Sequence, residues 1–391
     1  MKLSQIEFRN HPILKNLKIS FTKSTGETYS NIIFVGENGC GKTTILNELF
    51  NYRNSKYIIN KMQILNDGDN SHFKCLYVAQ DIKFRNAINS VNKAIGGSIF
   101  YKDLIESDNS SNSNSANATS IKKNNIVNDK SMLVKRLTDF YNERVASFLL
   151  NSDSPLMDDI SKQVLINGNG ISPKVDTFSS GEQELILRLE TLKSRIFSDL
   201  DILIIDEPET SLHPKWQLKI VPFIVDILKD NKTGKRDLQL FIASHSENVL
   251  KSIFDRSDTL IVRLYKDNDT IKGQNITAMD TVLNKTTIAE IQYLVFGIIS
   301  SEYHNQLYGK FLSMCGRTQA DVSRYLQKKY GEKYETLLNP YGYIFNNEIE
   351  NLPTYIRNAT DHPENTDRHY TEKDLTKSIE LLRKEIEGYT K

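Results

Sequence analysis

The sequence predicts an α/β fold: a mostly parallel sheet covered by helices, with a helical insertion and a helical C-terminal region. Short apolar runs recur along the chain, and each is followed by a polar turn or by a segment with helical character. The runs are Asn31–Val35, Asp201–Ile205, Leu238–Ala243 and Thr259–Leu264. Continuous apolar runs are typical of parallel strands that helices cover on both faces. Because the pattern becomes helical from about Thr286 onward, we expect a sheet domain over 1–285 and a helical domain over 286–391.

The composition narrows the class of protein. The chain has 391 residues, which corresponds to two or three domains at roughly 100–200 residues each. Its 50 Lys and Arg against 49 Asp and Glu leave a net charge of +1, which disfavours a strongly basic nucleic-acid protein but leaves local basic patches open. Cys40, Cys75 and Cys315 lie far apart, which argues against a disulfide framework and fits a reducing compartment. We find neither a signal-peptide core nor a membrane-length apolar run, so we expect a cytoplasmic protein that does not enter a membrane.

The elements of the sheet domain follow in order. Residues 17–21 alternate between apolar and polar, which predicts a half-buried strand. The run 31–35 ends in a glycine-rich turn, after which Thr43–Phe50 has helical character. Phe73–Ala79 predicts a further buried strand.

A polar segment then interrupts this domain. Between Ser107 and Ser120, ten of fourteen residues are Ser or Asn. Such a segment has almost nothing to bury and cannot offset the entropy that ordering costs. We therefore predict a flexible loop over 106–131, inside a helical insertion over 85–170.

The strongest motif is the glycine-rich turn after 31–35. Its sequence Gly36-Glu37-Asn38-Gly39-Cys40-Gly41-Lys42-Thr43 matches GxxxxGK[ST], and it stands between a predicted strand and a predicted helix, as a P-loop must. The glycines let backbone N–H groups face phosphate oxygens, Lys42 can reach the β- and γ-phosphates of ATP, and the Thr43 hydroxyl can ligate Mg²⁺. The residues that we expect to bind the nucleotide here are Gly36, Asn38, Gly39, Gly41, Lys42, Thr43 and Thr44.

A second motif matches independently. The apolar run that begins at Ile202 ends in two adjacent carboxylates, Asp206 and Glu207. Neighbours on a strand point to opposite sides, but at the strand end the chain can turn both toward the phosphates. We expect Asp206 to hold Mg²⁺ and Glu207 to act as the general base on the attacking water. Without a P-loop, the same pair would be an ordinary solvated strand end.

A third motif, Phe178-Ser179-Ser180-Gly181-Glu182-Gln183, runs into an apolar helix 26 residues before Asp206. Ser180, Gly181 and the following helix N-terminus form a potential phosphate-binding edge. On its own the motif is only a helix N-cap, and its position gives it meaning.

The stretches GENGCGKTT, FSSGEQE, LIIDEPETSLHP and IASHS, in that order, resemble an ATP-binding-cassette ATPase of the RecF/SMC and OLD-type branch. The resemblance implies that Gln80 senses Mg²⁺ and the γ-phosphate. It implies that Ser180 and Gly181 contact ATP bound by the opposite subunit, that residues 211–213 fall in the D-loop, and that His245 is the switch histidine. Glu182 departs from the transporter signature, which together with the long insertion disfavours a transporter subunit.

The C-terminal region matches no cassette motif. Residues 288–312 and the ending from Leu352 resemble the helical tail of bacterial antiphage-type ATPases, such as those of the Septu and PARIS systems, which are partners of separate nucleases. Thr371 with Asp374 predicts a capping box for a last helix over 372–387.

Within this tail, residues 357–362 fit the pattern RNxxxH, which resembles the active-site motif of HEPN ribonucleases. The resemblance implies phosphate contact by Arg357 and acid–base chemistry by His362. In the alternative interpretation, which we favour, both residues position a helix end before Pro363.

Together these features predict an ATP-binding and ATP-hydrolysing switch ATPase that uses Mg²⁺. Its expected catalytic residues are Lys42, Glu207 and His245, and its expected metal contacts are Thr43, Asp206 and Gln80. We expect an ATP-dependent homodimer or higher oligomer that regulates a nuclease or Toprim effector encoded nearby in antiphage defence. An ATP-gated ribonuclease using Arg357 and His362, and a RecF-like DNA-repair ATPase that binds nucleic acid, stay open as alternatives.

Overall fold

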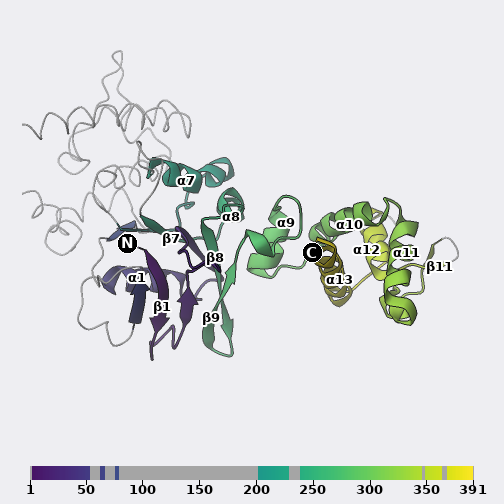
Figure 1. The fold of residues 1–391 in the computed structure, drawn as a ribbon, viewed down its shortest axis with the longest axis horizontal. Helices are drawn as coiled ribbons and strands as arrows, with labels where there is room; N and C mark the ends of the chain where they lie inside the picture. The colour runs from purple at the N-terminus through teal and green to yellow at the C-terminus, as the bar shows by residue number, and fades with distance from the viewer. Residues whose placement is uncertain are drawn as a thin grey trace, which may run out of the picture. The chain divides into compact units, whose positions relative to one another are not determined.

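The computed structural model describes residues 2–52, 62–66, 75–78, 201–228, 238–345, 348–362 and 368–390. The predicted insertion over 85–170, its loop over 106–131, and the site residues Gln80, Ser180 and Gly181 lie outside these ranges. The chain divides into two compact units, Met1–Ile253 with Asp258–Gln274, and Phe254–Ser257 with Asn275–Lys391. Figure 1 shows the elements of both units.

The first unit is built on a six-stranded sheet of order β5-β6-β7-β3-β8-β9 (Figure 1). Its strands are β3 (Asn31–Gly36), β5 (Cys75–Val78), β6 (Ile202–Asp206), β7 (Gln239–Ala243), β8 (Thr259–Asp267) and β9 (Thr270–Ile276). The pairs β5–β6, β6–β7, β7–β3 and β3–β8 are all parallel. Every residue of β3, β6 and β7 is buried, as continuous apolar runs require. The predicted α/β fold class is therefore confirmed.

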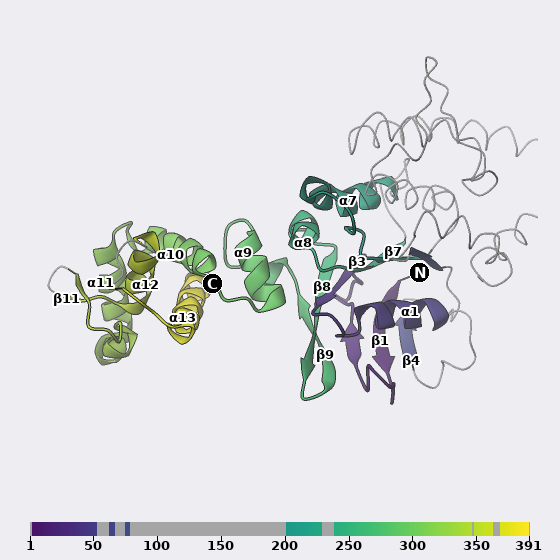
Figure 2. The ribbon, with the colours of Figure 1, turned by 180° about the vertical axis from the view of Figure 1, so that it is seen from behind.

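Helices cover this sheet on both faces. They are α1 (Lys42–Tyr52), α7 (Pro214–Ile227) and α8 (Glu247–Ile253). The chain passes from β6 through α7 to β7, and from β7 through α8 to β8, and both steps move in the same direction across the sheet. The helix α1 follows β3 and leads toward β5, which lies in the opposite direction. Right-handed crossovers therefore place α1 opposite α7 and α8, which Figure 2 shows.

A smaller antiparallel sheet of order β2-β1-β4 packs beside the main one. Its strands are β1 (Leu3–Phe8), β2 (Lys18–Ser20) and β4 (Met62–Asn66). Phe21, which follows β2, meets Phe34 and Phe241 of the main sheet at ring-centroid distances of 6.4 and 5.4 Å. These rings join the two sheets through one apolar core.

Gly36, the last residue of β3, accepts no side chain. Its φ is +143°, and a Cβ there would lie 2.1 Å from the carbonyl oxygen of Leu264 and 2.8 Å from Cys40 Sγ. We expect Gly36→Ala to lower the free energy of unfolding by about 2–4 kcal/mol, since backbone must move. Gly26→Ala is the matched control, because Gly26 also has positive φ (+87°) but open space around its Cβ position. Urea denaturation should show the larger loss for Gly36→Ala, and equal losses would contradict the steric argument.

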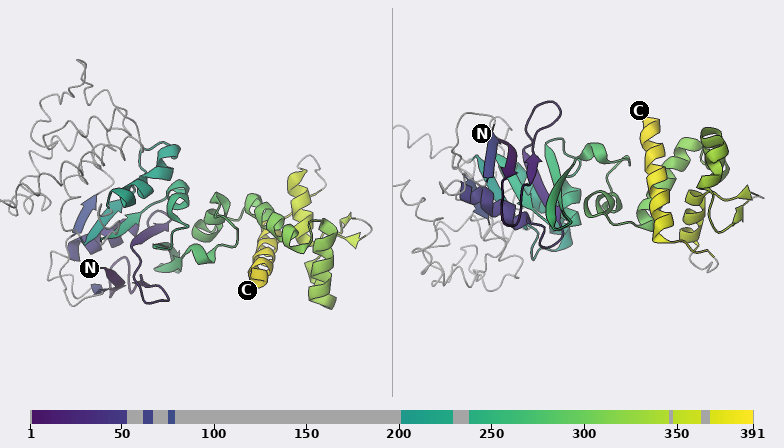
Figure 3. Two further views of the ribbon diagram at one scale, coloured as in Figure 1. Left: turned by 45° about the horizontal axis from the view of Figure 1, so that its top comes forward. Right: turned by 90° about the horizontal axis from the view of Figure 1, so that it is seen from below.

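The second unit is mainly helical (Figures 1 and 3). Its helices and strands are α9 (Ile288–Ile291), α10 (Ser301–Cys315), α11 (Gln319–Tyr330), α12 (Leu352–Asp361), α13 (Glu372–Thr390), β10 (Ile344–Phe345) and β11 (Glu348–Ile349). The helix α10 packs against α11, α12 and α13 around a core that includes Tyr303, Phe311 and Ile379. The hydroxyl and N–H of Thr371 both donate to Asp374, so the capping box predicted for the last helix is present.

The second unit begins earlier than residue 286, where the sequence pattern placed the boundary. Val282 is buried in the helical core, its N–H donates to Glu290 and its carbonyl accepts from Lys310. These contacts attach the segment after β9 to the helices. Among the helices that the structure describes, none is long and apolar enough to cross a membrane.

His304 on α10 is fully buried, and its Nε2 lies 2.9 Å from the Ser378 hydroxyl on α13. Burial lowers the pKa of His304 from 6.5 to about 4. Between these pH values the unfolded chain binds a proton that the folded chain does not, so the free energy of unfolding should fall as pH falls from 6.5 toward 4. In His304→Gln this part of the pH dependence should vanish when unfolding is measured across that window. An unchanged slope would contradict the assignment to His304.

Candidate active site

The P-loop connects the end of β3 to the start of α1. Gly39 and Gly41 have φ values of +78° and +90°, which glycine adopts without strain. A Cβ on Gly41 would lie 2.7 Å from Leu14 Cδ2, so the Leu14 side chain would have to shift to admit one. The backbone conformation that cradles phosphate is thus fixed by local sequence and by contact with the segment after β1.

Lys42 is held inside this loop. Its side chain is 6% exposed, and Nζ donates to the carbonyl oxygens of Gly36 (2.9 Å) and Glu37 (3.1 Å). These two acceptors fix the ammonium group at the carboxyl end of β3. Thr43 and Thr44 follow at the N-terminus of α1, where unpaired N–H groups favour an anion.

The two carboxylates at the end of β6 differ in backbone conformation, because Asp206 is the last strand residue and Glu207 follows it in a turn. Asp206 is 2% exposed, and its Oδ2 accepts from the Tyr77 hydroxyl of β5 (3.3 Å). Glu207 has a φ of +46°, a left-handed conformation that is costly for a residue with a side chain. Its N–H still donates to the carbonyl of Ala243 on β7 (2.9 Å). The left-handed turn is what takes Glu207 out of the strict alternation of a strand.

His245 lies against Glu207. Its Nε2 is 3.0 Å from Glu207 Oε1, and both side chains are partly exposed. Burial raises the pKa of Glu207; the nearby carboxylates of Glu209 and Asp206 add to the rise, whereas His245 and Lys42 oppose it. A carboxyl group with raised pKa beside an imidazole is the electrostatic setting in which a general base is found.

These groups line one cleft of about 620 Å³. Its lining residues are Asn38, Gly39, Gly41, Lys42, Thr43, Thr44, Glu207 and His245. The structure therefore brings eight of the expected site residues together from the loop after β3, from α1 and from the segments after β6 and β7. Gly36 and Asp206 stand at the ends of the strands beside them.

Residues 55–251, half of the chain, match the family described as "AAA domain, putative AbiEii toxin, Type IV TA system". The chain belongs to this AAA-domain family. The matched range contains Asp206, Glu207 and His245 and begins after the P-loop. Family membership and the P-loop together make the chain a P-loop ATPase, as the motifs predicted.

Individual relatives are more distant. The chain is 30% identical over 273 residues to Multidrug resistance protein 1 of Plasmodium falciparum, in the isolates FC27 and 3D7, and the match covers 64% of this chain and 18% of that protein. The chain thus spans less than a fifth of the length of these relatives.

Two solved structures similar to the chain are an SmcHead bound to the C-winged helix domain of ScpA and a bacterial Atm1-family ABC exporter with ATP bound. The SmcHead is 13% identical, with a TM-score of 0.40, over 72% of this chain and 100% of that one. The exporter is 16% identical, with a TM-score of 0.37, over 74% of this chain and 42% of that one.

Three residues of this AAA domain support the site, although no motif argument singled them out. Tyr77 donates to Asp206, Glu209 accepts from the loop that carries His245, and Gln217 accepts from Ser246. Glu209 was visible as a third acidic residue just after the carboxylate pair, but its partners are 35–37 residues away. His213, in the segment that the resemblance assigns to the D-loop, is the N-cap of α7.

The residues of the RNxxxH pattern lie in the second unit, at the end of α12. The guanidinium of Arg357 is 2.6 Å from Asp361 and also donates to Asn358 (3.0 Å). The helix ends at Asp361, and His362 is its C-cap. The ribonuclease interpretation stays a prediction, and metal-independent RNA cleavage by the purified chain is its test.

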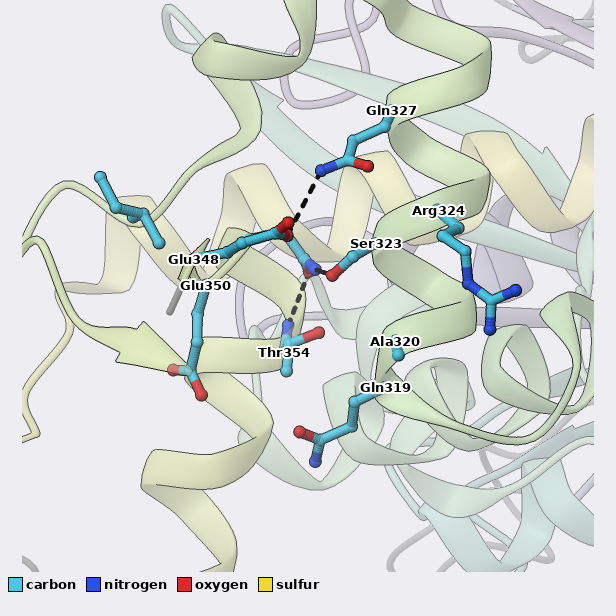
Figure 4. A pocket seen from close by; sticks show the side chains of 10 residues that line it. Gln319, Ala320, Ser323, Arg324, Gln327, Glu348, Glu350 and Thr354 are labelled. Atoms are coloured by element: carbon cyan, nitrogen blue, oxygen red, sulfur yellow. Dashed lines mark hydrogen bonds between the residues drawn. The ribbon is translucent and has the colours of Figure 1, made fainter. Parts of the chain in front are cut away.

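A smaller pocket of about 270 Å³ lies in the second unit, between α11 and the residues from β11 to α12 (Figure 4). Two pairs of its polar side chains contact each other: Asn351 donates to Ser323 (3.1 Å), and Gln327 lies 3.5 Å from Glu348. None of the expected site residues lines this pocket.

Proposed function

We propose that this AAA-domain protein is a Mg²⁺-dependent ATPase that works as a switch for a partner effector in defence against phage. The observation that carries the ATPase half is the convergence of Lys42, Thr43, Glu207 and His245 on one cleft. The effector half rests on the likeness of the helical tail to antiphage-type ATPases.

The residues present fit ATP and Mg²⁺. The glycine turn would cradle phosphate oxygens through backbone N–H groups, and Lys42 lies where a β- or γ-phosphate could replace its carbonyl acceptors. Thr43 and Asp206 offer the oxygen ligands that Mg²⁺ prefers. Among the described residues no group of three or more His, Cys, Asp or Glu is arranged to hold a metal, so phosphate and water would complete the coordination. When bound, Mg²⁺ would neutralise the charge that develops on the phosphates.

The chain's own residues supply the remaining chemistry. Glu207 would accept the proton of the attacking water, and its raised pKa suits that task. His245, 3.0 Å from Glu207, would orient the carboxylate and stand beside the γ-phosphate. Gln80 would add a further contact to the metal and the γ-phosphate. Ser180 and Gly181 would complete the site of a second subunit, which makes ATP binding the signal for dimerisation.

The test combines turnover, assembly and effector control. The purified chain should release phosphate from ATP only with Mg²⁺, and ATP should shift its molar mass to a dimer or larger oligomer in light scattering. Subunits with Lys42→Ala and subunits with a bulky residue at 181 should be inactive alone and should regain about one functional site per dimer when mixed. A nuclease or Toprim protein encoded nearby should change activity with the ATP state of this chain. Absence of turnover would refute the ATPase half, and an indifferent effector would refute the switch half.

A further inference from the structure

We infer that Glu209 is a positioning residue: its buried carboxylate fixes the backbone of residues 244–246 and thereby holds the His245 imidazole against Glu207. The inference rests on the proposed function, since it concerns the ATP-hydrolysing site.

The carboxylate of Glu209 is the anchor of the loop that follows β7. Oε1 accepts from the hydroxyl of Ser244 (2.7 Å), the N–H of His245 (2.9 Å) and the N–H of Ser246 (3.2 Å). Glu209 is 8% exposed and Ser244 is fully buried. Hydrogen bonds to an ionised acceptor are roughly twice as strong as neutral ones, and these three converge on one atom. The loop backbone is therefore tied to Glu209.

His245 is consequently held at both ends. Its main-chain N–H is bound by Glu209, and its side-chain Nε2 lies 3.0 Å from Glu207 Oε1. Glu207 and Glu209 both lie in the segment that follows β6. In the parallel pairing of β6 with β7, Asp206 lies opposite Ala243, so the segments after the two strands start side by side. One short segment thus carries Glu207, the proposed general base, and Glu209, which positions His245 beside it.

Gln217 on α7 adds a second bridge between the same two segments. Its Nε2 donates to the carbonyl of Leu212 (3.0 Å), and its Oε1 accepts from the Ser246 hydroxyl (2.8 Å). Leu212 lies in the segment that the resemblance assigns to the D-loop. That segment and the loop of His245 are therefore tied together through side chains as well as through the strands.

Hydrogen exchange of the nucleotide-free full chain tests this placement without any turnover. Glu209→Ala should speed exchange of the His245 and Ser246 amides by about tenfold or more, because the loss of a charged acceptor costs ~1.5–3 kcal/mol. In the ATPase assay kcat should fall on the order of 100-fold, the cost of a misplaced catalytic group, while ATP affinity stays unchanged.

Two further variants separate the position of the oxygen at residue 209 from the charge of its side chain. Glu209→Gln keeps an oxygen at the position of Oε1 and loses the charge, which weakens the three hydrogen bonds without removing them, so exchange and kcat should fall between those of the parent chain and those of the alanine variant. Glu209→Asp keeps the charge but withdraws the oxygen by about 1.5 Å, so it should behave like the alanine variant. The opposite ranking, with Asp active and Gln inactive, would overturn a positioning role. The comparison of Glu209→Gln with Glu209→Asp still tests the positioning role if the alanine variant does not fold.

Glu290→Ala is the matched control. Glu290, like Glu209, is buried and accepts two backbone N–H groups, those of Val282 and Leu283, but it lies in the second unit and does not line the cleft. The Glu290→Ala variant should speed hydrogen exchange of the amides of residues 282 and 283. It should leave kcat and the exchange of the amides of residues 245 and 246 unchanged. If the parent chain shows no ATPase, the proposed function fails while the exchange result still stands. If Glu209→Ala exchanges and turns over like the parent, the inference itself is wrong.

Discussion

Glu207→Gln should bind ATP as well as the parent chain and hydrolyse it about 10²–10⁴-fold more slowly. Gln has the same size, and its amide oxygen can occupy the position of Oε1, 3.0 Å from His245 Nε2. The lining of the cleft is therefore preserved, and only the basic carboxylate is lost. Phosphate release under saturating ATP measures turnover, and a fluorescent nucleotide measures binding.

Glu27→Gln is the control for that experiment. Glu27 is an exposed carboxylate that pairs with Lys23 and lies outside the cleft, so its amide variant should match the parent in both measurements. Equal loss of binding and turnover in Glu207→Gln would count against Glu207 as the general base. It would indicate instead that the carboxylate supports the structure of the nucleotide site.

Lys42→Ala should give the opposite signature, a loss of ATP binding. Removal of a charged donor to phosphate costs about 1.5–3 kcal/mol, which corresponds to roughly 10- to 100-fold weaker affinity. The same change frees the carbonyls of Gly36 and Glu37, so the melting temperature must be measured beside the affinity. Isothermal calorimetry with a non-hydrolysable ATP analogue reads binding without interference from turnover.

Lys215→Ala is the control for Lys42→Ala, because Lys215 is an exposed lysine near the start of α7. A Lys42→Ala variant that remains folded and binds ATP like the parent would contradict a phosphate contact by Lys42. The two substitutions in the cleft thus separate ATP binding from hydrolysis. Lys42→Ala is expected to lose binding, whereas Glu207→Gln is expected to lose turnover and keep binding.

The sequence predicted the parts of this protein that depend on local chemistry. The P-loop could be recognised because Gly36, Gly39 and Gly41 have positive φ values, which favour glycine whatever structure surrounds the loop. The parallel sheet could be recognised because strands such as β6 and β7 are buried along their whole length and therefore read as continuous apolar runs.

The domain boundary was harder to place from the sequence. Val282 and the residues around it show no helical periodicity of their own, and they join the second unit through burial and through hydrogen bonds to Glu290 and Lys310. Periodicity detects a helix and not the irregular segment that packs onto it. The assignments of Gln80, Ser180 and Gly181 stay predictions, since these residues lie outside the described ranges.

By itself the sequence determined the fold class and the chemical identity of the cleft, because glycine turns, apolar runs and paired carboxylates are properties of neighbouring residues. Only the tertiary structure decided how the cleft is held together. The partners of Glu209 are 35–37 residues away in the chain, and the parallel register of β6 and β7 is what brings them within hydrogen-bond distance. The reach of Glu209 depends on that register, which no spacing of motifs records, and the left-handed turn at Glu207 is likewise visible only in the structure.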